Sequence, residues 1–183
     1  MGTGDGRAVL ARARAEPDSL VLGLDANAAG MADAASRAAR RLVQGGLPNA
    51  RYIVVAAEAL PDELAATADL VTVQFPWGSL LRGIVRAEPA MIAALVGLLR
   101  PARDAELRLL LSVEPRDRSL GLEPLDASGI DRLAGRFEAH GIEAVRVRPG
   151  TAQELAASHS TWAKRLGSAG ARRTAWSLRF VRR

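Results

Sequence analysis

Apolar runs and helix-forming segments alternate along almost the whole chain, and this order limits the fold more than any other feature. Five short runs are rich in branched apolar residues, as buried parallel strands are. These runs span 20–27, 50–58, 69–75, 105–115 and 142–149. The segments expected to be helical span 28–44, 78–86, 89–99, 126–139 and 151–167, the last with an alternative end before Ser158. The order predicts an α/β fold, in which helices cover both faces of a mostly parallel sheet.

The end of the chain and its length complete the predicted architecture. Residues 173–183 alternate apolar and polar side chains, which predicts a last strand antiparallel to its neighbours. The chain has 183 residues and shows no linker, repeat or low-complexity segment. We therefore expect a single domain over 1–183.

Composition excludes several classes of protein. There is no cysteine, so a disulfide framework and a thiolate metal site are excluded, and we expect no metal cofactor. No apolar run reaches the roughly 18 residues that a membrane span needs, and no signal peptide is seen, which predicts a cytoplasmic protein that binds no membrane. The net charge is +5, and of 25 basic residues only Lys164 is a lysine. A GC-rich genome and a polyanionic partner both explain this bias, and charge alone does not separate them.

A glycine-rich loop opens the chain and is followed at once by a helix-forming run. In the stretch GTGDG, Gly2, Gly4 and Gly6 alternate with Thr3 and Asp5. Glycine at this spacing lets the backbone turn tightly and approach a ligand, and the N-terminus of the following helix favours negative charge. The loop therefore predicts a site for a nucleotide-like cofactor.

Two acidic residues at strand ends narrow the choice of cofactor. Asp25 ends its strand 19 residues after Gly6, where a carboxylate accepts hydrogen bonds from ribose hydroxyls. Dinucleotide enzymes use G-x-G-x-x-G, whereas here Arg7 stands where the third glycine would be. The pattern G-x-G-x-G with a strand-end acid is more typical of S-adenosylmethionine enzymes. Glu58, after the next strand, is placed to contact an adenine, although ordinary strand-end polarity also explains either acid.

Four more motifs occur in order after the glycine loop: GGLPN at 45–49, AAEALP at 56–61, FPWGSLLRG at 75–83 and STWAKRL at 160–166. Together they resemble the 16S ribosomal RNA adenine-1408 N1-methyltransferases, a kanamycin–apramycin aminoglycoside-resistance family. The resemblance implies a class I S-adenosylmethionine-dependent methyltransferase fold and methylation of adenine 1408 at N1. It also implies a monomer whose partner is the 30S subunit, at helix 44 of 16S rRNA.

The resemblance assigns roles to particular residues. Trp77 and Trp162 correspond to two aromatic residues that sandwich the flipped adenine, and Arg172 to a basic residue that holds this nucleotide or contacts rRNA. Gly170 departs from the family, whose members commonly have a basic residue there. The residues implied at the cofactor are Gly2, Thr3, Gly4, Asp5, Asp25, Ala57 and Glu58. Those implied in RNA binding are Arg40, Arg41, Arg82, Ser160, Thr161 and Arg165.

The chemistry of N1 methylation agrees with aromatic residues in place of a catalytic base. N1 of adenine carries an in-plane lone pair and no proton, so it attacks a sulfonium methyl once it is exposed and aligned. Because N1 lies on the pairing edge, the base must be unpaired or flipped, and stacking holds it by about 1–3 kcal/mol. The strand at 69–75 ends in Phe75-Pro76-Trp77 rather than in the Asn/Asp-Pro-Pro-Tyr pattern of enzymes that methylate the exocyclic amine.

One expected strand is missing from the sequence. In methyltransferases of this class a strand precedes the glycine loop and lies between those expected here at 20–27 and 69–75. We expect Met1 to be a misassigned start, with ~20–30 further residues upstream in the natural chain. Two other functions stay open: a methyltransferase of this fold that acts on another RNA or a small molecule, and a cofactor- or RNA-binding protein without catalysis.

Overall fold

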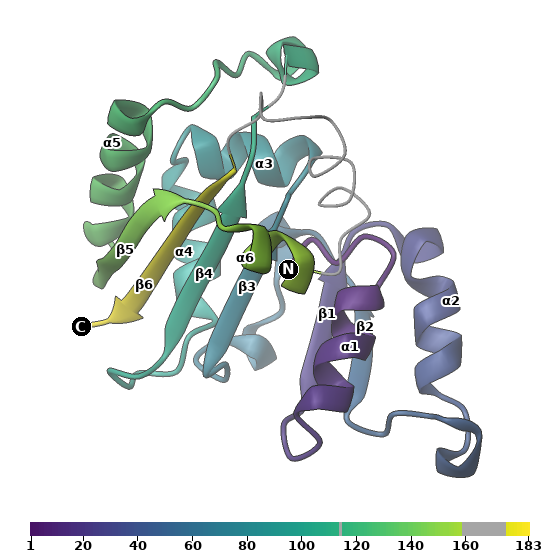
Figure 1. Cartoon of the computed structure of the whole chain (residues 1–183). Helices are drawn as coiled ribbons and strands as arrows, with labels where there is room; N and C mark the ends of the chain where they lie inside the picture. Colours follow the sequence, from purple (N-terminus) through teal and green to yellow (C-terminus); the bar gives the residue numbers. More distant parts are fainter. Residues whose placement is uncertain (114, 159–174) are drawn as a thin grey trace.

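The computed structural model describes residues 1–113, 115–158 and 175–183, and its strands form two sheets (Figure 1). The smaller sheet is a parallel pair of β1 (Val21–Asp25) and β2 (Ala50–Val54). The larger sheet has the order β3-β4-β6-β5. Its strands are β3 (Leu70–Gln74), β4 (Glu106–Leu111), β5 (Ile142–Pro149) and β6 (Trp176–Arg182). β3 and β4 are parallel, whereas β6 is antiparallel to both β4 and β5, which confirms the predicted α/β fold with an antiparallel last strand.

Helices cover the two sheets. The smaller sheet packs against α1 (Arg7–Ala15) and α2 (Ala28–Ala38). Behind the larger sheet in Figure 1 lie α3 (Gly78–Val85), α4 (Pro89–Gly97) and α5 (Ala127–Glu138). On its other side lies the short α6 (Ala152–Ala157). Short 3₁₀ helices span Leu42–Gln44, Ala57–Ala59, Asp62–Leu64 and Pro115–Leu120. None of the helices described is long and apolar enough to cross a membrane.

Several predicted elements are longer than those observed, because local and tertiary hydrogen bonds end them early. The helix expected over 28–44 stops at Ala38, whose carbonyl accepts a hydrogen bond from the Leu47 N–H (2.9 Å). The strand expected over 50–58 stops at Val54, before the 3₁₀ turn Ala57–Ala59. The strand expected over 105–115 likewise stops at Leu111.

The last predicted helix and strand are partly described. α6 ends at Ala157, the alternative end before Ser158, and residues 159–167 lie outside the described residues. The last strand is observed over Trp176–Arg182, while 173 and 174 of the expected segment are also outside them.

The main hydrophobic core lies between the larger sheet and the helices behind it. Phe137 on α5 and Phe180 on β6 are fully buried, and their rings stack with centroids 5.1 Å apart. Leu95 from α4 and Leu107 from β4 are fully buried in the same cluster. Leu24 of β1 also belongs to this core, so the smaller sheet packs on the larger one.

A second, smaller cluster supports the β1–β2 pair. Its buried members are mostly small side chains: Val9, Leu10, Ala13, Ala34, Ala38 and Ala50. Burial of apolar area stabilises by about 25 cal/mol per Å², so these alanines contribute less than the leucines and phenylalanines of the main core. The smaller sheet is therefore the less strongly stabilised part of the fold.

Truncation of the stacked pair tests this division of the core. Phe137→Ala leaves a cavity beneath β6 and should lower the free energy of unfolding by about 3–5 kcal/mol, measured by urea denaturation. Leu20→Ala, at a side chain that is 66% exposed, is the control and should change it by no more than about 0.5 kcal/mol. Equal losses in the two variants would contradict the assignment of the core.

Candidate cofactor and RNA site

The glycine loop is fixed to the carboxyl end of β1 by one backbone carbonyl. The Leu24 oxygen accepts hydrogen bonds from Gly2 N (2.9 Å), Thr3 N (3.2 Å) and Thr3 Oγ1 (2.9 Å). The loop therefore lies over the end of this strand, and α1 starts from it. This is the place that the sequence predicts for the cofactor loop.

Two of the loop glycines differ in what surrounds them. Gly6 has φ 74°, and a Cβ there would lie 2.5 Å from the Cβ of Ala34 and 2.8 Å from the Tyr52 ring, so only glycine lets α1 approach α2 and β2. The Tyr52 hydroxyl donates to the Gly6 carbonyl (2.9 Å), and burial raises the pKa of Tyr52 to about 12, which keeps this donor protonated. Gly4 has φ 58° and nothing within 4 Å of a would-be Cβ. The backbone at Gly4 is thus open to an approaching ligand.

Asp25 connects the loop to the start of α2. Its Oδ2 accepts a hydrogen bond from Gly4 N (2.8 Å), and its Oδ1 accepts one from Asn27 N (2.8 Å). Asn27 in turn caps α2, with its Oδ1 accepting from Gly30 N (3.1 Å). Each oxygen of an ionised carboxylate has two lone pairs, so Asp25 can still accept hydrogen bonds from a ligand's hydroxyl groups.

The other predicted cofactor residues lie in the glycine loop or after β2, at the carboxyl ends of the two parallel strands β1 and β2. We call this end of the β1–β2 pair the cofactor edge. The Asp5 carboxylate accepts from Arg7 N (3.1 Å) and pairs with the Arg7 side chain (3.5 Å), so it stabilises the start of α1. Ala57 is buried in the main core, and Glu58 beside it is exposed. Both follow β2, and Val55 N, directly after that strand, donates to the Asp25 carbonyl (2.9 Å). The contact of Glu58 with an adenine stays a prediction.

An exposed tryptophan follows the end of β3. Phe75 is buried and has φ 48°, a backbone conformation that costs a non-glycine residue about 1–3 kcal/mol and that is concentrated at functional sites. Phe75 N donates to the Leu110 carbonyl (2.7 Å), so the residue just after β3 is still bonded to β4. Pro76 is buried and Trp77 is 71% exposed at the start of α3. A large apolar ring held in water at a strand end is a surface on which a base can stack.

The predicted RNA-binding arginines occupy two separate places. Arg82 is exposed on α3, five residues after Trp77. Arg40 and Arg41 are exposed after α2, which starts beside Asp25 and carries the chain back to the start of β2. The segment that follows α2 and carries these two arginines therefore lies at the opposite end of the β1–β2 pair from the carboxyl end of β1 (Figure 1).

Five predicted site residues lie outside the described residues. They are Trp162, Arg172, Ser160, Thr161 and Arg165. Their roles in base stacking and RNA binding stay predictions. Within the described ranges, no group of three or more His, Asp or Glu residues is arranged to hold a metal ion.

Comparison with known proteins decides the family. Residues 1–181 match the model of the NpmA family, described as 16S rRNA (adenine(1408)-N(1))-methyltransferase. The chain belongs to this family. The enzyme of that description from Streptoalloteichus hindustanus is 36% identical over an alignment of 173 residues, and the match covers 92% of this chain and 79% of the relative. The resemblance that the sequence motifs indicated is confirmed.

Two solved structures show the same fold. A mutant of the 16S rRNA (adenine(1408)-N(1))-methyltransferase from Catenulisporales acidiphilia, with its cosubstrate SAM, is 34% identical with a TM-score of 0.86, over 99% of this chain and 83% of that one. The aminoglycoside resistance methyltransferase NpmB1 is 36% identical with a TM-score of 0.83, over 100% of this chain and 84% of that one. The methyltransferase fold expected from the sequence is therefore confirmed.

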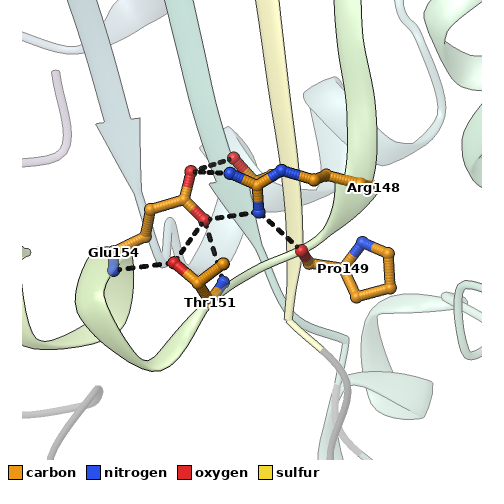
Figure 2. A network of polar contacts seen from close by, with 5 residues as sticks. Arg148, Pro149, Thr151 and Glu154 are labelled. Carbon is orange, nitrogen blue, oxygen red and sulfur yellow. Dashed lines mark hydrogen bonds and ion pairs between the residues drawn. The ribbon is translucent and has the colours of Figure 1, made fainter.

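A polar network anchors α6 of the methyltransferase (Figure 2). Thr151 and Glu154 form a capping box, in which Glu154 N donates to Thr151 Oγ1 (3.2 Å) and Thr151 N donates to Glu154 Oε2 (2.9 Å). Arg148 donates to both carboxylate oxygens (2.8 and 2.9 Å) and to the Pro149 carbonyl (2.9 Å). Ser177 Oγ donates to Glu154 Oε1 (2.9 Å). The carboxylate thus joins α6 to both β5 and β6.

Glu154 is ionised because its partners outweigh its burial. Burial alone raises the pKa of Glu154, but hydrogen bonds from the Thr151 backbone, Arg148, Ser177 and the Thr151 hydroxyl lower it to about 2 from 4.5. A carboxyl whose folded-state pKa is depressed stabilises the fold above its unfolded pKa. Its contribution is therefore complete above pH 4.5 and is lost as the pH falls toward 2.

Removal of the Glu154 charge should change the free energy of unfolding over the same pH range. Glu154→Gln should lower the free energy of unfolding at pH 7 by about 1–3 kcal/mol, because charged hydrogen bonds are lost. The difference from the wild type should shrink as the pH falls from 4.5 to 2, measured by denaturation at each pH. Glu143→Gln, at an exposed carboxylate on β5, is the matched control. A difference between wild type and Glu154→Gln that does not depend on pH would refute the role of the charge.

Proposed function

We propose that this methyltransferase transfers a methyl group from S-adenosylmethionine to N1 of adenine 1408 in 16S rRNA, which gives aminoglycoside resistance. Family membership supports the reaction. The observation that supports the position of the target base is the exposed indole of Trp77 at the end of β3. The substrate is the rRNA of the 30S subunit at helix 44, and the chain acts on it as a monomer.

The cofactor edge, at the carboxyl end of β1, offers groups that can bind this methyl donor. Asp25 offers carboxylate oxygens to the ribose hydroxyls, and the backbone at Gly4 is open above it. Asp25 is held by two backbone N–H groups, so it is already oriented before a ligand arrives. When bound, S-adenosylmethionine supplies an electrophilic methyl group on a positively charged sulfur. Thr3 and Asp5 hold the loop and the start of α1 in place.

The residues after β3 offer the target adenine a surface on which to stack. Stacking on an aromatic face is worth about 1–3 kcal/mol per base, and the indole of Trp77 is exposed enough to accept one. The indole face also favours the positive charge that develops on the adenine ring as N1 is methylated. N1 carries no proton, so the enzyme has to align and stabilise the base rather than deprotonate it. Trp162 is the proposed second aromatic partner.

Exposed arginine side chains offer positive charge to the phosphates of the RNA backbone. Arg82 is close in sequence to Trp77, whereas Arg40 and Arg41 lie at the far end of the β1–β2 pair. An rRNA substrate is large enough to reach both places, and guanidinium groups pair with phosphates in a bidentate fork. The net charge of +5 agrees with such a partner. Arg165 and Arg172 are proposed to hold the nucleotides next to the target.

Substitution of the acid tests the cofactor site. Asp25→Asn keeps the size of the side chain but removes the charge that strengthens its hydrogen bonds, so the Kd for S-adenosylmethionine should rise about 10–100-fold in isothermal titration calorimetry. Asp33→Asn, at an exposed acid on α2, should leave the Kd unchanged. An unchanged Kd in Asp25→Asn would remove this residue from the site.

Substitution of the tryptophan tests the base site and the reaction together. In primer extension on 16S rRNA from 30S subunits treated with the enzyme and S-adenosylmethionine, reverse transcriptase should stop next to adenine 1408, because methylated N1 blocks pairing. Trp77→Ala should lower the rate of this modification about 10–100-fold through lost stacking, and Trp77→Phe should lower it less. Val145→Ala, exposed on β5, should match the wild type.

The possible outcomes separate the alternatives. A stop that depends on the cofactor, is weakened in Trp77→Ala and is kept in Val145→Ala supports the proposal. A stop at another position would point to another RNA target. Cofactor binding without any stop would point to a binding protein that transfers no methyl group.

A further inference from the structure

Phe75 breaks the alternation of side chains along the strand that it follows. On β3, Val71 and Val73 belong to the main core behind the larger sheet. Successive side chains of a strand point to opposite faces, so a strand that continued regularly would direct Phe75 to the same core. Phe75 belongs instead to a separate buried cluster, which it forms with Leu110 of β4 and Ala175. The chain therefore changes direction at Phe75.

This cluster lies on the face of the larger sheet that carries α6. Leu109 and Leu111, the neighbours of Leu110, belong to the main core, so Leu110 points to the other face. Leu155 of α6 packs against the cluster. Figure 1 shows α6 on the side of the sheet opposite α3 and α4. Phe75 therefore packs beneath α6, whereas the helix α3 that follows it lies on the opposite face.

Two backbone contacts close the cluster. Phe75 N donates to the Leu110 carbonyl (2.7 Å), and Gly150 N, just after β5, donates to the Ala175 carbonyl (2.7 Å). A Cβ at Gly150 would lie 3.1 Å from Leu110 Cδ1 and 3.3 Å from Leu155 Cδ1, so the backbone there also packs closely on the cluster. Phe75 has the largest side chain of the cluster, and it is held between β4, α6 and the start of β6.

The backbone conformation of Phe75 depends on this packing. Its φ is 48°, in the left-handed region that a phenylalanine rarely adopts. The next residue is Pro76, and a residue before proline favours extended backbone with negative φ. A strained conformation of this kind persists only where the surrounding structure fixes it. The buried ring supplies that constraint, because an extended backbone would direct it to the opposite face of the sheet.

The turn at Phe75 sets the position of the exposed tryptophan. Trp77 follows two residues later, at the start of α3, and its side chain is 71% exposed. The ring of Pro76 fixes its own φ, so the direction that the chain takes at Phe75 is carried on to Trp77. A relaxed turn would therefore move the indole relative to the ends of β3 and β4.

We propose that Phe75 is a positioning residue for methyl transfer, because its ring, packed between β4, α6 and the start of β6, keeps the turn that places the Trp77 indole. The inference rests on the proposed function, in which this indole stacks on the target adenine. Phe75 acts through Trp77 in this role. It also lines a cavity beside the glycine loop, together with Gly2 and Gly4, so each test includes cofactor binding.

Single-turnover methylation of 30S subunits at saturating S-adenosylmethionine measures the alignment of the base. Phe75→Ala should lower this rate about 10–100-fold, since a displacement of 1 Å can cost about a hundredfold. Phe75→Leu keeps an apolar side chain in the cluster and should lower the rate less than about fivefold. Leu155→Ala loosens the same cluster from α6 and should lower it about 3–10-fold. The Kd for S-adenosylmethionine should stay within about threefold of the wild type in all three variants.

A variant in the main core separates positioning from stability. Phe137→Leu shortens a fully buried aromatic side chain on α5, far along the chain from β3. It should lower the thermal unfolding midpoint, as Phe75→Ala does, but leave the methylation rate unchanged. The rates are compared at a temperature at which circular dichroism shows every variant to be folded.

A fluorine spectrum follows Trp77 without any reaction. The chain has three tryptophans, so protein labelled with 5-fluorotryptophan gives one resonance for each, and the spectrum of Trp77→Phe assigns that of Trp77. The Trp77 resonance should shift in Phe75→Ala and in Leu155→Ala. The second variant removes no aromatic ring, so its shift reports a change around the indole itself. Phe137→Leu should leave this resonance in place.

Three results would overturn the proposal. The first is a Trp77 resonance that stays unchanged in both Phe75→Ala and Leu155→Ala. The second is a rate in Phe137→Leu that falls as far as in Phe75→Ala, which would reduce the effect to stability. The third is a Kd for S-adenosylmethionine that rises as far as the rate falls, which would place the role of Phe75 at the cofactor. A wild-type enzyme that leaves no stop at adenine 1408 would contradict the proposed function instead, and the fluorine spectra would still decide whether Phe75 fixes Trp77.

Discussion

The carbonyl of Leu24 and the carboxylate of Asp25 fix the loop on which the cofactor edge depends. Three donors from Gly2 and Thr3 converge on the Leu24 oxygen, and Gly4 donates to Asp25. These bonds set where α1 starts and leave the backbone at Gly4 open. Without them, the loop would have no fixed relation to the strand whose acid is proposed to bind the ribose.

Much of the fold follows from local sequence patterns. Branched apolar runs predict the strands because their side chains suit a sheet buried on both faces, and alternation predicts the antiparallel β6. The element ends are less predictable, since tertiary bonds set them. No local pattern shows that the Ala38 carbonyl pairs with Leu47 N, which ends α2 six residues before Gln44.

Part of the candidate site could likewise be predicted from local sequence patterns, and part of it could not. Asp25 and the glycine loop could be predicted because their pairing follows from a strand end and a short loop, and Trp77 because it follows directly after β3. The Glu154 network could be predicted only as the capping box Thr151–Glu154. Its other partners come from β5 and from β6, and Ser177 is 23 residues away in sequence. A pairing of that kind depends on the sheet register, which sequence spacing does not show.

The two halves of the proposed site rest on different sheets, and this links stability to catalysis. Asp25 and the loop belong to the β1–β2 pair, whose own cluster is mostly alanine, whereas Trp77 follows β3 in the well-packed sheet. Methyl transfer needs the donor and the base in line, and a misplacement of 1 Å can cost about a hundredfold in rate. The alignment therefore depends on what spans the space between β1 and β3, which is the hydrogen bonding of residues 1–3 and the packing of Leu24 in the main core.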